Sequence, residues 1–214
     1  MKGLHTTFDR LLQKYVSNDG RVKYKELQSE RELLQGYITT LENHAEVTSM
    51  TENEELAYWI NFYNALTILL ITDHYPISSI MKINDGKAWD LQLAETGDRS
   101  LSLNDIEHRI IRRKFDKPSI HFAVNCAALS CPKLLNEAYT ADKLSNQFAA
   151  QKDYFLNNPK KNLLQGNPVK ISRIFDWYKE DFGELFVYLK DYLGSDTTTS
   201  QIDYMEYDWA LNDW

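Results

Sequence analysis

The sequence has little of what would mark a fibrous, disordered, disulfide-rich or membrane-spanning chain. Its 214 residues include 8 glycines and 5 prolines, too few for a low-complexity chain and typical of long regular elements. Two cysteines cannot build a disulfide scaffold. The longest apolar run, residues 65–72, is far shorter than the roughly 18 residues of a transmembrane helix. We therefore expect no membrane span.

The N-terminal segment also lacks the apolar stretch of a signal peptide. This leaves two expectations for the compartment. Either the protein is cytoplasmic, or it is exported or periplasmic and a signal peptide has been removed from it.

Positive charge is scarce as well. The 24 Lys and Arg residues are outnumbered by 31 Asp and Glu residues, which gives a formal net charge of −7. Because affinity for a phosphate backbone rests on clustered basic residues, we expect no nucleic-acid partner. The one basic cluster, residues 109–114, is typical of a solvated helix end.

Apolar residues are plentiful, at 43% of the chain, and aromatic residues make up 13%. They suffice for the core of a soluble globular protein. Helix and strand patterns follow one another without a steady βαβ alternation, which predicts an α+β fold. We expect a mostly helical chain with a small antiparallel sheet, forming a single domain over residues 1–214. A helical part, about residues 1–50, would pack on the core, residues 88–101 would form a hairpin, and a strand would cover about residues 201–209.

The most regular pattern is a long apolar helix. Thr51 is a candidate N-cap with Glu54 at the capping-box position, and Pro76 predicts that the helix ends near His74. Residues 56–70 are apolar nearly all round. This pattern is typical of a central buried helix.

Two amides interrupt that helix. Asn61 and Asn64 are three residues apart and share a helix face, and a buried amide without a partner costs on the order of 1–3 kcal/mol. Either they hydrogen-bond a neighbouring loop, or they line a substrate pocket together with Trp59 and Tyr63.

Another helix is expected to begin at Ser102, a candidate N-cap. Glu107 lies four residues after one apolar side chain of this helix and three before the next, so it points with the apolar stripe. Glu107 is therefore a candidate buried acid, or it pairs with an arginine such as Arg113 under a loop. His108 lies at the margin of the stripe.

Residues Ile120–Cys126 (IHFAVNC) have the best strand pattern in the chain. On a strand, His121 and Cys126 would point to opposite faces. A proline follows Cys131 and favours the first position of a helix. We therefore expect Cys131 to be the N-cap of a short helix over Pro132–Glu137.

These residues suggest a cysteine-based active site. A cysteine nucleophile needs a thiolate, a base that forms it and a group that orients the base. A helix N-terminus lowers the pKa of a thiol, so Cys131 is the candidate nucleophile, with His121 as base and Glu107 as orienting group. His108 is the alternative base. Cys126 is the weaker nucleophile and is interpreted as a small core residue.

Metal binding is less well supported. The spacing of His121, Cys126 and Cys131 supplies ligand types that zinc accepts, but it is not the spacing of C-x2-C sites. On a strand, His121 and Cys126 would also face apart. The chain has no glycine-rich phosphate loop, H-E-x-x-H or G-x-S-x-G motif. We therefore expect no metal and no cofactor.

Several stretches carry recognisable motifs. They are LAYWINFYNALT (Leu56–Thr67), SLNDIEHRIIR (Ser102–Arg112), IHFAVNCAALSCPKL (Ile120–Leu134) and FDWYKEDF (Phe175–Phe182), together with DGRVKYKEL (Asp19–Leu27) and YDWALN (Tyr207–Asn212). Taken in their order along the chain, these stretches resemble domain-of-unknown-function family 547 over nearly the whole chain. The last two look like its bacterial, single-domain, secreted-type members.

The resemblance implies little chemistry, because the family is one of unknown function. The order of His121 before Cys131 is similar to that in permuted papain-like cysteine hydrolases, which implies a permuted papain-like core. Bacterial members often carry an export signal that this sequence lacks, which leaves the compartment open.

Two hypotheses of function follow. The first is a cysteine-dependent hydrolase or acyl/amide transferase, similar to a protease or an amidase. The second is a non-catalytic module that binds a peptide or a glycan through an aromatic surface, its buried polar residues forming a structural network. The sequence does not identify the ligand, whether peptide, glycan or small molecule.

Overall fold

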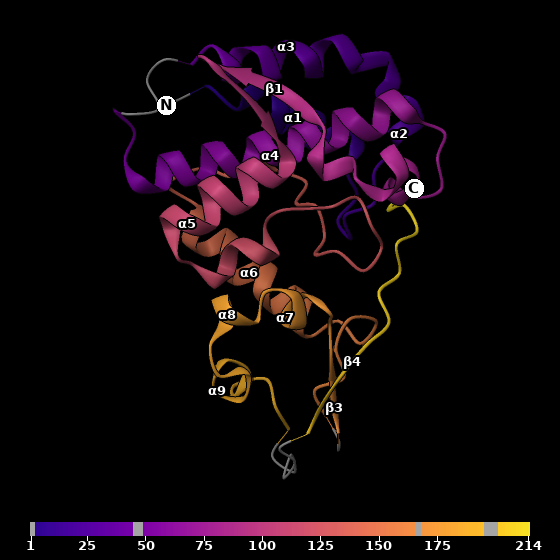
Figure 1. The fold of residues 1–214 in the computed structure, drawn as a ribbon, viewed down its shortest axis with the longest axis vertical. Helices are drawn as coiled ribbons and strands as arrows, with labels where there is room; N and C mark the ends of the chain where they lie inside the picture. The colour runs from indigo at the N-terminus through magenta and orange to yellow at the C-terminus, as the bar shows by residue number, and fades with distance from the viewer. Residues whose placement is uncertain (1–2, 45–48, 166–167, 195–200) are drawn as a thin grey trace.

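Helix α4 (Glu52–His74) runs through the centre of the upper part of the molecule (Figure 1), in a computed structural model that describes residues 3–44, 49–165, 168–194 and 201–214. The backbone N–H and the hydroxyl of Thr51 both donate to the Glu54 carboxylate, at 2.9 and 2.8 Å, and cap the helix. The helix ends before Pro76, where a proline disfavours helical backbone. Residues 56–72 are all buried, so the prediction of a central buried helix is confirmed.

Short and medium helices cover α4. They are α1 (Thr6–Tyr15), α2 (Tyr24–Leu27), η1 (Gln28–Glu30) and α3 (Arg31–Glu42). The buried side chains of α1, α2 and α3 belong to the same hydrophobic cluster as those of α4. The N-terminal part of the chain therefore packs on the central helix.

A hairpin lies beside these helices. Three short turns of 3-10 helix, η3 (Ile80–Lys82), η4 (Asn84–Gly86) and η5 (Ala88–Asp90), lead into β1 (Gln92–Thr96), which pairs antiparallel with β2 (Arg99–Ser102). The expected hairpin is confirmed. Directly after it, η6 (Asp105–Ile111) packs against α4 and continues into α5 (Arg112–Phe115).

The lower part of the molecule has its own apolar cluster. It is built from α6 (Leu144–Leu156), α7 (Ile174–Trp177), α8 (Lys179–Phe182) and α9 (Leu185–Leu189). There β3 (Val169–Ile171) pairs in parallel with β4 (Ile202–Tyr204). Beyond Tyr204 the chain returns along one side of the molecule to the upper part (Figure 1), where Asp213 pairs with Val22. The C-terminal segment thereby ties the two parts together.

The α+β class is confirmed, but the expected positions of some elements are wrong. The segment Ile120–Cys126 is not a strand, because η7 (Pro118–Phe122) is a 3-10 helix and residues 123–126 are irregular. The sheets formed by the described residues lie elsewhere, and one of them is parallel. The expected helix over Pro132–Glu137 is also absent. No helix among the described residues has the length and apolar character needed to cross a membrane.

Candidate functional site

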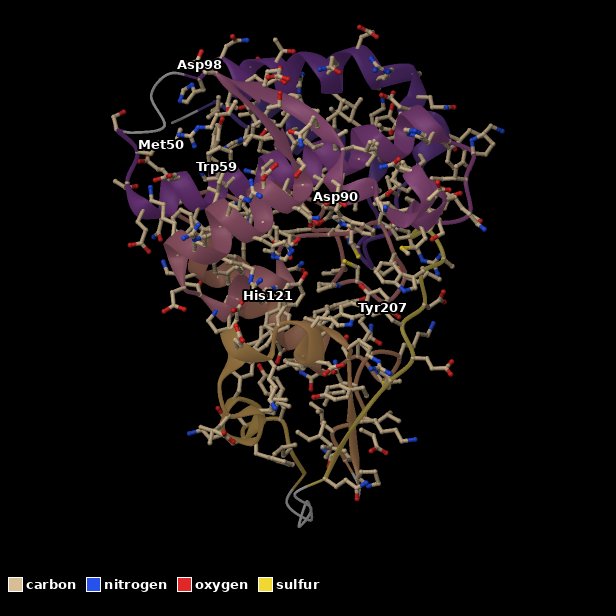
Figure 2. The ribbon with its side chains drawn as sticks, viewed as in Figure 1. Met50, Trp59, Asp90, Asp98, His121 and Tyr207 are labelled. Carbon is tan, nitrogen blue, oxygen red and sulfur yellow. The ribbon has the colours of Figure 1, made fainter. Side chains whose placement is uncertain are left out.

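A cavity of about 170 Å³ lies where the upper and lower parts meet, at the level of His121 and Tyr207 (Figure 2). Residues from η5, η6, η7, α4, α7 and the C-terminal segment converge on it. Its lining consists of Tyr63, Trp89, Asn104, Glu107, His108, His121, Val124, Cys126, Cys131, Pro132, Ile174, Trp177, Tyr178, Tyr207 and Trp209.

The irregular loop that carries both cysteines is held by buried amides. The Asn64 side chain donates to the Ala123 carbonyl at 3.0 Å and accepts from the Asn125 amide at 2.9 Å. Asn125 in turn donates to the Pro132 carbonyl at 2.7 Å and accepts from the Ala127 amide at 2.9 Å. Ala127 has a φ of 61°, which L-residues rarely adopt. The loop therefore holds a strained backbone next to Cys126 by a network of buried hydrogen bonds.

The two cysteines form a close pair at one wall of the cavity. Their sulfurs are 2.7 Å apart, and the Cys126 amide donates to the Cys131 sulfur at 2.9 Å. The Tyr207 oxygen lies 3.2 Å from the Cys126 sulfur. Cys126 is partly exposed and Cys131 is buried. Cys126 is therefore the thiol that a ligand would meet first.

The surroundings separate the two thiols in acidity. Burial raises the pKa of Cys126, but its contacts with Cys131, Tyr207 and the Ala128 amide outweigh burial and bring the pKa below its ordinary value. Burial and the neighbouring Cys126 sulfur raise the pKa of Cys131 well above its ordinary value. Cys126 is thus the more acidic thiol of the pair.

We expect oxidised glutathione to join the two cysteines in a disulfide. The Cys126 thiolate attacks a glutathione sulfur and displaces one glutathione thiolate, and the Cys131 thiolate then displaces the second. The protein loses two hydrogens, which intact-mass spectrometry detects, and thiol titration falls to zero. A glutathione that stays attached to Cys126 would contradict the closeness of the two sulfurs.

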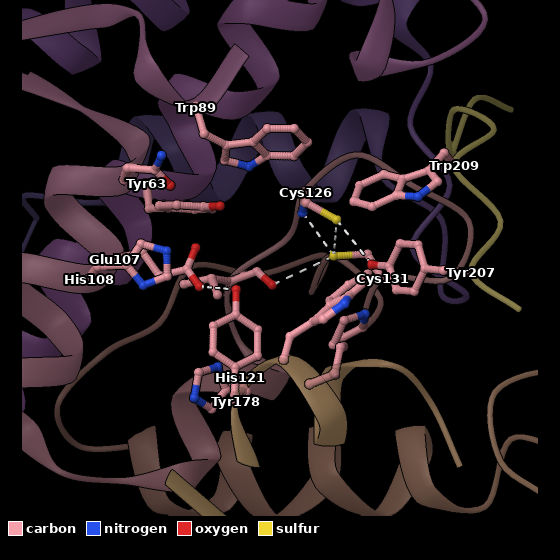
Figure 3. A pocket seen from close by; sticks show the side chains of 15 residues that line it. Tyr63, Trp89, Glu107, His108, His121, Cys126, Cys131, Tyr178, Tyr207 and Trp209 are labelled. Atoms are coloured by element: carbon pink, nitrogen blue, oxygen red, sulfur yellow. Dashed lines mark hydrogen bonds between the residues drawn. The ribbon is translucent and has the colours of Figure 1, made fainter. Parts of the chain in front are cut away.

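Opposite the cysteines lies the carboxylate of Glu107 (Figure 3). Glu107 is 5% exposed and accepts a hydrogen bond of 2.6 Å from the Tyr178 hydroxyl. Burial and the nearby carboxylate raise the pKa of Tyr178, so its hydroxyl keeps the proton that it donates. Among the described residues no basic side chain pairs with Glu107, and the alternative of an ion pair with Arg113 is not observed. Glu107 is therefore a buried acid that faces the cavity.

The segment η6 that carries Glu107 is a π-helix. π-Helical turns are rare and frequently occur at functional sites. Their wider turn lets the consecutive residues Glu107 and His108 both line the cavity. Arg112 donates to His108 Nδ1 at 3.0 Å, and because a guanidinium has no acceptor, that nitrogen carries no proton.

His121 belongs to a second polar group at the floor of the cavity. Its Nε2 lies 2.6 Å from Asp181, which Arg112 holds with two bonds of 2.6 and 2.8 Å. The Tyr178 ring stacks on the imidazole with centroids 4.0 Å apart. Burial lowers the pKa of His121 against the raising effect of Asp181, and its Nδ1 has no partner among the described residues. The arrangement is that of an imidazole oriented by a carboxylate.

The structure brings most of the residues singled out in the sequence to this cavity. The four candidate catalytic residues all line it, as does Tyr63. No hydrogen bond links either imidazole to a thiol among the described residues. Trp59, Asn61 and Asn64 do not line it; the two amides bond loop backbone instead.

Sequence reasoning missed the cavity residues Trp177 and Trp209 and five further contributors to the site. Trp89 was read as a strand residue and Arg112 as part of a solvated helix end, while the other three had no role. Those three lie in the motifs FDWYKEDF and YDWALN, whose presence was the one signal that could have indicated them. They are Tyr178, Asp181 and Tyr207.

No group of three or more His, Cys, Asp or Glu side chains within the described ranges has the arrangement of a metal site.

Comparisons with known proteins give a family and no closer relative. A family model described as "Protein of unknown function, DUF547" matches residues 47–156, slightly more than half of the 214 residues. The match includes both cysteines, His121 and Glu107, and leaves out Tyr178, Asp181 and Tyr207. Neither the curated proteins nor the solved structures contain a match.

Proposed function

The chain belongs to the DUF547 family of proteins of unknown function, and we propose from its geometry that it is a cysteine-dependent hydrolase or acyl/amide transferase with Cys126 as nucleophile. One observation carries this proposal. The Cys126 sulfur lines a cavity, and its contacts with the Cys131 sulfur, the Tyr207 oxygen and the Ala128 amide lower its pKa. Such contacts favour the thiolate, which is the reactive form of cysteine.

The choice of Cys126 over Cys131 follows from exposure and charge. Cys131 is 5% exposed, and its pKa is raised. No helix begins at Pro132 to favour a thiolate there. Cys131 instead lies 2.7 Å from the Cys126 sulfur, and this contact lowers the pKa of Cys126.

In the proposed reaction the Cys126 thiolate attacks a carbonyl carbon of the substrate. The Tyr207 hydroxyl and the Ala128 amide, which hold the sulfur charge at rest, are close enough to stabilise the oxyanion that develops. The bond to the leaving amine or alcohol breaks and a thioester remains on Cys126. Water, or a second acceptor, then releases the acyl group.

His121 is the candidate base for the second step. Its Nε2 proton is directed at Asp181, which leaves the Nδ1 lone pair free to accept a proton. Glu107 and Tyr178 form a second proton-holding pair in the same cavity. The role of His121 as base is kept, whereas Asp181 takes the orienting role that was predicted for Glu107.

Labelling of the whole chain with iodoacetamide at neutral pH tests the nucleophile. We expect Cys126 to react several-fold faster than a free model thiol, because more of it is thiolate. Cys126→Ser should abolish the fast phase, whereas Cys131→Ala should slow it by removing the contact that lowers the pKa of Cys126. With p-nitrophenyl acetate, the acetyl group should appear on Cys126 in a peptide map. Fast labelling at Cys131, or none at either position, would contradict the proposal.

A non-catalytic binding module is the second candidate, favoured by one observation. No imidazole is hydrogen-bonded to a thiol among the described residues, while aromatic rings surround much of the cavity. In that case the Cys126→Ser variant keeps every ligand interaction, and no acyl group is transferred.

A further inference from the structure

The cavity combines aromatic rings with one buried carboxylate. Three of the five tryptophans of the chain line it, together with three tyrosines. The tryptophans come from separate parts of the chain and meet at the cavity: Trp89 and Trp209 have ring centroids 5.8 Å apart, as do Trp177 and Trp209. Indole and phenol faces attract cations through the ring quadrupole. Such a wall is therefore suited to a positively charged or an apolar ligand.

The charges that face the cavity decide between these two. Glu107 is the one carboxyl side chain in the lining, to which no Lys, Arg or Asp contributes. Arg112 donates a hydrogen bond to His108 Nδ1, and burial lowers the pKa of His121, which disfavours its charged form. The one acidic side chain of the lining therefore offers a partner to a cation.

Glu107 itself lacks a counter-charge. In the described part of the chain its carboxylate receives one hydrogen bond, from Tyr178, and forms no ion pair. A buried charge without a partner is costly, and a cation offsets this cost better than a neutral hydroxyl does. The second carboxylate oxygen is available to such a ligand.

From these observations we propose that the cavity binds the cationic group of its ligand, a quaternary ammonium or alkylammonium head, between Glu107 and the tryptophan faces. Glu107 and the cysteines lie on opposite walls of the cavity (Figure 3). A ligand whose cation meets Glu107 can therefore place its carbonyl at Cys126, and only this placement rests on the proposed function. A cavity of about 170 Å³ is of the size that admits one small head group, since about 150 Å³ admits benzene.

Choline and 3,3-dimethylbutan-1-ol form a matched pair of probes, because the second replaces the charged nitrogen by carbon with the same shape. We expect calorimetric titration of the full chain to give choline an affinity at least roughly tenfold above that of its neutral isostere. This comparison needs no variant. Equal affinities, or no binding of choline, would overturn the proposal, and so would competition for the same site by a neutral methyl glucoside in place of choline.

Three variants assign the effect. Glu107→Gln should weaken choline binding roughly tenfold and leave the isostere unchanged, whereas Glu32→Gln, at a carboxylate 90% exposed in its side chain, should change neither. Cys126→Ser should leave choline affinity within about twofold. If choline binds but Cys126 takes up no acyl group, the proposed reaction is contradicted and the cation site is retained. If Cys126 takes up the acyl group but choline does not bind, only the cation site is contradicted.

Discussion

Replacement of Asn64 by alanine is expected to destabilise the fold by about 2–4 kcal/mol and to abolish the fast labelling of Cys126. Asn64 is 2% exposed, and its two hydrogen bonds hold the backbone of Ala123 and Asn125. Without the amide, a buried carbonyl and a buried N–H lose their partners. The loop that positions Ala127 and Cys126 then loses its anchor on α4.

Asn61→Ala provides the matched control. Asn61 is equally buried, lies on the same face of α4 and makes two hydrogen bonds to the Tyr139 backbone, at 2.8 and 2.9 Å. It should cost a similar free energy of unfolding in urea and leave the labelling rate of Cys126 unchanged. If both variants slow labelling equally, the effect is one of general stability. If neither loses more than about 0.5 kcal/mol, the amides do not hold the loops.

These amides also explain why the predicted strand over Ile120–Cys126 is wrong. The apolar alternation of Ile120–Cys126 fits a strand, and a strand needs backbone partners from a neighbour. Here the partners come from the Asn64 side chain, and the carbonyl of Phe122 accepts from Gln151 at 3.1 Å. A side chain 59 residues away leaves no local pattern. Periodicity therefore identified a buried segment and assigned it the wrong backbone.

The expected helix after Cys131 failed for a related reason. Distant side chains donate hydrogen bonds to the first carbonyls of this segment. Lys161 donates to the Cys131 carbonyl, and Gln151 donates to the Lys133 carbonyl at 2.8 Å. A proline at a favourable helix position is compatible with a helix but does not require one. The α4 prediction succeeded because its signals are local, namely a capping box, a long apolar stretch and a proline stop.

Part of the candidate site could likewise be predicted from local sequence signals. Glu107 faces inward as its helical phase predicts, and a π-helical turn brings His108 with it. The partners that give the site its chemistry are far away in the chain: Asp181 lies 60 residues beyond His121, and Tyr207 lies 81 residues beyond Cys126. Residue type alone could not choose between the two cysteines, because burial and neighbouring groups decide which thiol has the lower pKa.

Acidification from pH 7 to pH 4 is expected to cost the protein about 3 kcal/mol of stability through His5 alone. Burial, with a contribution from the nearby His44, lowers the pKa of His5 from 6.5 to about 4. His5 is 7% exposed, and its Nδ1 lies 2.6 Å from the Tyr37 hydroxyl. Below pH 6.5 His5 binds a proton in the unfolded chain, whereas in the folded chain it binds one only near pH 4. The free energy of unfolding therefore falls throughout this pH range.

His5→Gln isolates this contribution, because an amide can keep the contact with Tyr37 and does not titrate. Urea unfolding at successive pH values should give the variant a shallower loss between pH 6.5 and 4, by about 3 kcal/mol, whereas His74→Gln, at an exposed position, should retain the wild-type slope. His121 acts in the same direction and accounts for part of the remaining slope. The carboxylates with depressed pKa, such as Asp105 and Asp181, stabilise the fold until the pH falls below about 4. They therefore act at lower pH than the range of 6.5 to 4 in which His5 acts. If His5→Gln leaves the change of stability with pH unaltered, His5 is not a buried neutral base.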